Sequence, residues 1–147
     1  MTNRRIDGSA TRRRLAAFVV LCLTAGAAVR AHHSFAAEFD GDKPIVLKGT
    51  IYRIDLVNPH SWLYVDVKNP DGTVSRWNVE MGAPNALIRR GVTKASVPVG
   101  VEVTVEGFRA KDGSNTANGR TVTLADGRGI FTGSSYTGPA PSDLNRK

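Results

Sequence analysis

The stretch of sequence that decides the fold is SWLYVDVKNPDGTVSRWNVE, residues 61–80. Side chains alternate in character along residues 61–68, which is the pattern of a β-strand with one buried face. Asn-Pro-Asp-Gly at 69–72 is a strong turn sequence, because proline and glycine supply the backbone angles of tight turns. Alternation resumes along residues 74–80, where Trp77 and Val79 share a face. The stretch therefore predicts a β-hairpin.

Upstream of this hairpin, residues 45–57 form a long β-branched run that predicts a first strand. Gly49 lies where a sharp bend or bulge is expected. Asn58-Pro59 ends the run, because proline donates no hydrogen bond and restricts the residue before it. Strict alternation would place Ile51 on one face of this strand and Tyr52, Ile54 and Leu56 on the other.

Downstream of the hairpin, residues 83–91 have the pattern of a short helix, with Pro84 at its start and Gly91 at its end. Alternating side chains predict a fourth strand over residues 101–109, with Val101, Val103 and Val105 inward. A polar loop over 110–119 leads to a fifth strand at residues 120–124, and Asp126-Gly127 turns the chain into a short extended piece at 130–131.

This order of elements predicts an all-β fold, namely a small five-stranded OB-fold-like Greek-key barrel over residues 45–131. One short helix is expected between strands three and four, where it can plug one end of the barrel. The long first strand with its internal glycine can bend around the corner and serve both sheets. A small β-sandwich is the alternative architecture.

The first 31 residues have the pattern of a secretory signal peptide. Arginines at 12–14 precede an apolar run over 15–29, and Val29 and Ala31 stand at the −3 and −1 positions of a cleavage site. The run is too short and too weak to span a bilayer core of about 30 Å. We therefore expect a periplasmic or secreted protein, exported by the Sec or the twin-arginine route, with no membrane span after cleavage.

Cleavage after Ala31 would leave an arm at 32–44, the barrel domain and a flexible tail at 132–147. It removes six arginines and one aspartate, so 14 basic and 12 acidic residues remain, a net charge of +2. A nearly neutral chain lacks the positive charge that nucleic-acid binding needs, and we expect no nucleic-acid partner. The one cysteine, Cys22, is removed with the signal peptide, so no disulfide is expected.

Several spaced motifs resemble the DUF6152 family of small exported bacterial proteins, whose function is not established. The motifs are His32-His33-Ser34-Phe35, Leu47-Lys48-Gly49-Thr50, Asn58-Pro59-His60-Ser61-Trp62, Pro84-Asn85-Ala86-Leu87 and Lys111-Asp112-Gly113-Ser114-Asn115. The resemblance covers nearly the entire mature chain. It implies location and fold, and it carries no known activity onto these residues.

The three histidines, His32, His33 and His60, are the candidate metal ligands. A terminal histidine can bind copper through its amine and its ring together, and a second imidazole would complete a three-nitrogen site. Such nitrogen donors suit Cu(II). His33 offers a different chelate through the amine, a backbone nitrogen and its own ring. The alternative is that His33 is a solvated arm residue and that His60 only supports the turn after Pro59.

A second candidate site, for a small ligand, combines aromatic rings on the second strand with polar groups of the loop between strands four and five. This loop and the loop between strands one and two flank the usual binding face of an OB-fold. Aromatic rings could stack on a planar or sugar-like ligand while polar groups fix its edge. The candidate residues are Trp62, Tyr64, Arg109, Asn115 and Arg120.

Catalysis has little support, because the chain carries no nucleophile elbow, phosphate loop or dinucleotide motif. The strand carboxylates Asp55, Asp66 and Glu80 are expected to be solvated or paired with Arg53 or Arg76. We therefore expect a binding module more than an enzyme. The three hypotheses are an exported module for a small molecule or an envelope protein, a copper-binding protein using His32 and His60, and a structural accessory subunit of an envelope complex.

Overall fold

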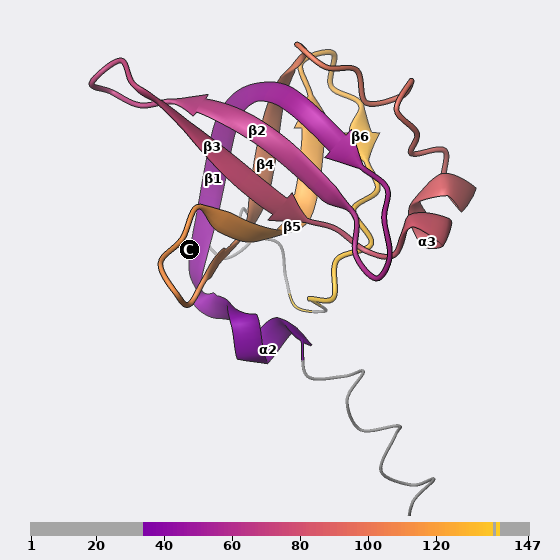
Figure 1. The fold of residues 1–147 in the computed structure, drawn as a ribbon, viewed down its shortest axis with the longest axis horizontal. Helices are drawn as coiled ribbons and strands as arrows, with labels where there is room; N and C mark the ends of the chain where they lie inside the picture. Colours follow the sequence, from indigo (N-terminus) through magenta and orange to yellow (C-terminus); the bar gives the residue numbers. More distant parts are fainter. Residues whose placement is uncertain (1–33, 137, 139–147) are drawn as a thin grey trace, which may run out of the picture. The chain divides into compact units, whose positions relative to one another are not determined.

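The computed structural model describes residues 34–136 and 138, and these form an all-β fold, as the sequence predicts. No helix in this part of the chain has the length and apolar character needed to cross a membrane. The elements follow in the order α2 (Ser34–Glu38), β1 (Phe39–Asp55), β2 (Trp62–Lys68), β3 (Val74–Glu80), α3 (Pro84–Arg89), β4 (Glu102–Ala110), β5 (Thr116–Leu124) and β6 (Gly129–Ile130) (Figure 1).

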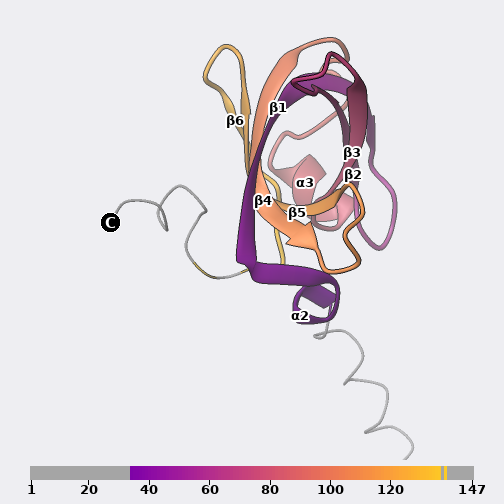
Figure 2. The same cartoon turned by 90° about the vertical axis from the view of Figure 1, so that its left-hand side faces the viewer.

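The first five strands form a closed ring of pairings. Strand β1 is antiparallel to both β2 and β4, while β2 pairs with β3 and β4 pairs with β5. A short parallel pairing of β3 with β5, from Asn78 opposite Thr116 to Glu80 opposite Asn118, closes the ring. Figure 2 shows β1 curving around this ring, with the β5–β6 hairpin at its edge. The predicted hairpin of β2 and β3 and the helix α3 before β4 are both present.

Strand β1 serves both neighbours because it bends. Its first part pairs with β4 and its last part with β2. At Gly49 the backbone of β2 comes so close that a Cβ atom would overlap the carbonyl oxygen of Asp66, which explains the glycine. The register shifts between Ile51 and Arg53, which marks a bulge at Tyr52.

The bulge corrects one prediction from the sequence. Strict alternation placed Ile51 and Ile54 on opposite faces, but both face the main core, with exposed fractions of 1% and 4%. Tyr52, the extra residue, is 45% exposed. One inserted residue reverses the facing of every residue that follows it, so an alternation count across a bulge fails.

Two strands are longer than the sequence predicts. Strand β1 begins at Phe39 instead of residue 45, because Phe39 pairs opposite Ala110 on β4 across an irregular stretch. Strand β5 begins at Thr116 instead of residue 120, because its first residues pair with β3. Both extensions depend on partners distant in sequence, which local patterning does not reveal.

The side chains form two separate hydrophobic clusters. The main core fills the ring and includes Val103 and Val105 of β4. Phe108 and Ala110 of the same strand belong to a second cluster, because residues of the other parity point to the opposite face. The second cluster is formed by Phe39, Phe108 and Ala110, with Phe35 of α2 and Tyr136 packed against them.

Candidate functional site

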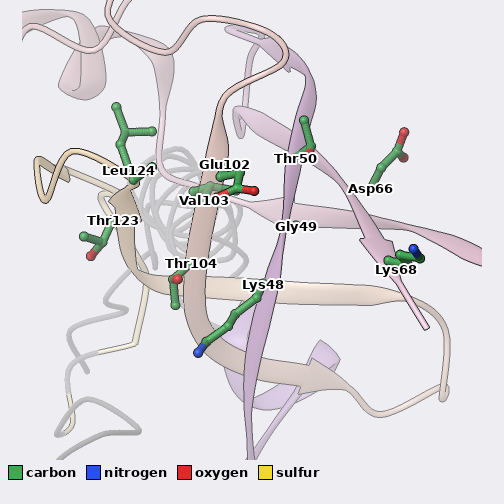
Figure 3. A pocket seen from close by; sticks show the side chains of 11 residues that line it. Lys48, Gly49, Thr50, Asp66, Lys68, Glu102, Val103, Thr104, Thr123 and Leu124 are labelled. Carbon is green, nitrogen blue, oxygen red and sulfur yellow. The ribbon is translucent and has the colours of Figure 1, made fainter. Parts of the chain in front are cut away.

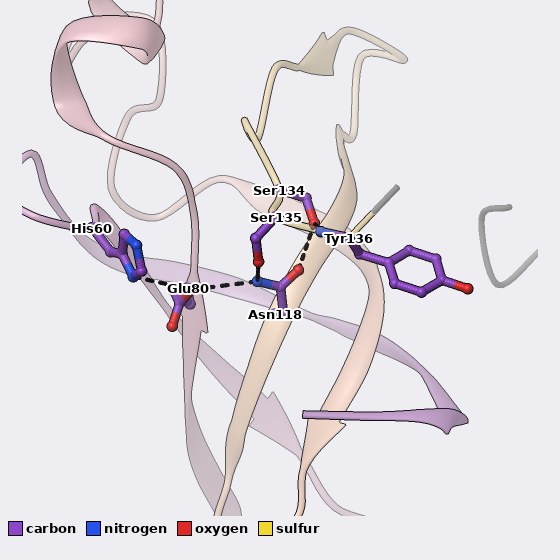
Figure 4. Close-up of polar contacts among 6 residues, drawn as sticks. All are labelled: His60, Glu80, Asn118, Ser134, Ser135 and Tyr136. Atoms are coloured by element: carbon purple, nitrogen blue, oxygen red, sulfur yellow. Dashed lines mark hydrogen bonds and ion pairs between the residues drawn. The ribbon is translucent and has the colours of Figure 1, made fainter. Parts of the chain in front are cut away.

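His60 lies in the connection between β1 and β2, directly after Pro59. Its Nδ1 atom is 3.2 Å from Oε1 of Glu80, the last residue of β3 (Figure 4). The Glu80 side chain is 4% exposed, whereas the His60 side chain is 34% exposed. A carboxylate that accepts a hydrogen bond from Nδ1–H fixes the ring and leaves Nε2 as the free nitrogen.

Glu80 belongs to a chain of polar contacts that reaches the C-terminal segment (Figure 4). The side-chain amide of Asn118 on β5 donates to Oε1 of Glu80 at 3.4 Å and to Oγ of Ser135 at 3.3 Å. The hydroxyl of Ser134 donates to Oδ1 of Asn118 at 2.5 Å. The backbone N–H of Tyr136 in turn donates to Oγ of Ser134 at 3.1 Å. These contacts position the carboxylate that orients His60.

The environment of Glu80 acts on its protonation in both directions. Burial raises the pKa of the Glu80 carboxyl above its usual value, since removal from water disfavours the charged form. The charge of His60 lowers that pKa, and the charge of Glu38 raises it. Burial is the largest of these influences, so the pKa of Glu80 is raised on balance.

The other two predicted metal ligands, His32 and His33, lie outside the described residues, as does the predicted signal peptide. Within residues 34–136 and 138, no three His, Cys, Asp or Glu side chains are close enough together to hold a metal ion. His60 with Glu80 is therefore a single oriented imidazole nitrogen. A complete site of this kind would need donors from outside the described residues.

The predicted ligand-binding residues do not converge in the structure. Trp62 and Tyr64 of β2 have the parity opposite to the core residue Leu63, so they lie on the outer face. The Arg53 guanidinium already stacks on the Tyr64 ring, with Cζ 4.2 Å from its centroid. Arg109 donates to the carbonyl oxygens of residues 113 and 114, so it supports the loop between β4 and β5.

Asn115 and Arg120 also have separate surroundings. Asn115 is exposed, and its carbonyl oxygen accepts the N–H of Asn78, which ties the loop to β3. Arg120 lines a groove next to α3 and β6. The five predicted ligand-binding residues therefore do not form one surface. The two aromatic residues lie on the outer face of β2, Arg109 and Asn115 support the loop between β4 and β5, and Arg120 lines a separate groove.

A hollow of about 420 Å³ lies over β1, β2 and β4 (Figure 3). Its charged side chains include Lys48, Lys68 and Asp66. They spread apart instead of converging on one point, and both carboxylate oxygens of Asp66 accept hydrogen bonds from Arg76. None of the predicted metal ligands or ligand-binding residues is among those that line this hollow.

The role of Glu80 differs from the one predicted for it. Two of the three strand carboxylates pair as expected, Asp55 with Arg53 and Asp66 with Arg76. Glu80 instead is buried and pairs with His60. The one local indication was that Glu80 ends its strand and directly follows Val79, which is buried. Its burial depends on Asn118 and the C-terminal segment, which sequence spacing does not place there.

The described residues form a small all-β fold with a closed ring of five strands and a histidine, in the loop between β1 and β2, that a carboxylate orients. A family model matches residues 19–119, and the chain belongs to DUF6152, a family of unknown function. The matched segment includes all three histidines. No curated protein matches the chain.

Proposed function

We propose that this protein is an exported, non-catalytic binding module whose ligand is Cu(II). In the mature chain beginning at His32, the ligands are the terminal amine, the His32 ring and Nε2 of His60. The observation that carries the proposal is the contact of His60 Nδ1 with the buried carboxylate of Glu80 at 3.2 Å.

A histidine that ligates a metal usually donates its second ring N–H to a carboxylate or a carbonyl group. This contact fixes the tautomer and the direction of the ligating nitrogen, and it increases the basicity of the ring. Glu80 has the position and the burial that this role requires. The Asn118 amide donates to the same oxygen, Oε1 of Glu80, so the position of this carboxylate has a second support.

The chemistry of the mature N-terminus supports the choice of His32 as the partner ligand. A terminal histidine offers its amine and its ring together, and His60 adds a second imidazole nitrogen. Amine and imidazole nitrogens suit Cu(II), which has the highest affinity among the divalent first-row metals.

Calorimetric titration with Cu(II) tests the proposal on the protein cleaved after Ala31. We expect tight one-to-one binding that weakens on acidification, because protons compete for the imidazoles and the amine. A variant with one glycine added before His32 and the variant His60→Ala should both lose tight binding. Glu80→Gln should bind about 10- to 100-fold more weakly, the range for loss of such a supporting partner.

His33→Ala is the matched control, because it removes a neighbouring imidazole that the proposed site does not use. It should bind Cu(II) as the parent protein does. Equal affinity in the parent, the extended form and His60→Ala would overturn the proposal. So would a correctly cleaved protein that binds no copper, or binding that depends on His33 instead of His60.

A further inference from the structure

A groove of about 500 Å³ runs between α3, β5 and the segment that contains β6. Ala86 of α3 forms part of one wall, and Ile130 and Phe131 form part of another. Arg120 and Thr121 of β5 line it between these walls. Neither His60 nor Glu80 lines the groove, although Ser134 at one end of it belongs to the contacts around Glu80.

Arg120 occupies an unusual backbone position in this groove. On β4, Glu106 and Gly107 lie opposite Thr121 and Gly119 of β5, so Arg120 is an extra residue with no partner across the strand. Its Nε atom is buried and has no hydrogen-bond partner among the described residues, and the guanidinium forms no ion pair there. A buried donor without an acceptor is unfavourable, so the site favours a ligand that supplies one.

The rest of the lining indicates which acceptor fits. Among the described residues, no Asp or Glu side chain lines the groove. Arg90 lies outside the lining, and its Cζ is 5.0 Å from the ring centroid of the lining residue Phe131. The Thr132 hydroxyl donates to the carbonyl oxygen of Arg120, and the Ser134 hydroxyl donates to Asn118. Donors for an anion therefore come mainly from the guanidinium, whose fork matches the two oxygens of a carboxylate.

We propose that this groove is a binding site for a small organic carboxylate with an apolar body. The Arg120 guanidinium binds the carboxylate, and Phe131, Ile130 and Ala86 contact the apolar part. A phosphate fits less well, because its additional oxygens would lack donors and it has no apolar part for these walls.

Titration of the mature protein with benzoate, followed by amide NMR, tests this site. Saturable shifts should map to residues 86, 120–122 and 129–134. Arg120→Gln should weaken benzoate binding by about tenfold or more, and Arg120→Lys should also weaken it because the planar fork is lost. The matched control is Arg76→Gln, since Arg76 is already paired with Asp66. It should leave the affinity within about twofold.

Acetate and inorganic phosphate serve as comparison ligands. Benzoate should bind more tightly than acetate, and Phe131→Ala should reduce that difference. Shifts that do not saturate, or that map elsewhere, would overturn the proposal even if an Arg120 variant failed to fold. Unchanged benzoate affinity in a folded Arg120→Gln protein would overturn it too, as would phosphate binding as tight as benzoate binding.

Discussion

Glu80 and Asp66 lie on neighbouring strands, and their surroundings move their pKa values in opposite directions. Burial raises the pKa of Glu80 above 4.5. Hydrogen bonds from Arg76 lower the pKa of Asp66 below 3.8. The Arg76 Nε atom lies 2.7 Å from Oδ1 of Asp66, and the Arg76 Nη2 atom lies 2.9 Å from Oδ2. Two carboxyl groups therefore have opposite consequences for stability, depending on whether burial or an arginine dominates the surroundings of the carboxylate.

The difference predicts opposite pH dependences for two variants. A raised folded-state pKa favours folding at low pH, so the stability advantage of the parent over Glu80→Gln should decrease as pH rises above about 4.5. A lowered folded-state pKa favours folding at high pH, so the advantage over Asp66→Asn should decrease as pH falls below about 3.8. Urea unfolding at a series of pH values measures both differences.

A His60→Ala background provides the control for Glu80. The charge of His60 lowers the Glu80 pKa, so removing the ring should make the loss of stability with rising pH larger. A Glu80→Gln difference that grows with pH would show that the carboxylate is stabilised by its surroundings. In that case its burial would not dominate its energetics.

At the scale of the strand, the close approach of β1 to β2 requires a glycine at position 49. An alanine Cβ at position 49 would overlap the carbonyl oxygen of Asp66, and the backbone cannot move away without disturbing the pairing. We expect Gly49→Ala to lower the free energy of unfolding by about 1–3 kcal/mol, as overpacking does. Thermal or urea unfolding measures the change.

The matched control is Gly129→Ala in β6, where no atom lies within 4 Å of the added methyl group. It should change the free energy of unfolding by less than about 0.5 kcal/mol. Equal effects of the two substitutions would mean that β1 and β2 do not approach closely at Gly49. The bend of β1 would then need another cause.

The elements that the sequence predicts well are those specified by near neighbours. The turn at 69–72 is stabilised by its own residues, with the Gly72 N–H bonded to the carbonyl oxygen of Asn69. Helix α3 ends before Gly91, whose φ of 79° favours glycine over other residues. Such local features leave a direct pattern in the sequence, so the hairpin, the helix and their order were predictable.

The features that the sequence did not reveal depend on distant partners. The beginning of β5 pairs with β3, and the burial of Glu80 needs Asn118 and the segment after β6. His60 was recognised as a candidate ligand from its residue type, but the group that orients it was not. A bulge such as that at Tyr52 also leaves no pattern strong enough to correct the alternation count.

In the described fold as a whole, the second hydrophobic cluster connects α2, at the beginning of the described residues, with Tyr136, near their end. The Phe35 ring of α2 lies with its centroid 4.9 Å from that of Tyr136 and 5.6 Å from that of Phe108. The segment that carries Tyr136 also contributes Ser134 to the contacts around Glu80. Packing of the aromatic cluster and orientation of His60 therefore share the same C-terminal segment.

This arrangement predicts energetic coupling between the two ends of the described fold. In a double-mutant cycle, Phe35→Ala and Tyr136→Ala should show a coupling free energy of about 0.5–1.5 kcal/mol, the range for an aromatic pair in contact. A control cycle of Phe35→Ala with Phe131→Ala should be additive within about 0.5 kcal/mol, because Phe131 belongs to neither core cluster. Urea unfolding of the single and double variants gives these values. Additivity in both cycles would show that Phe35 of α2 and Tyr136 of the C-terminal segment do not stabilise each other.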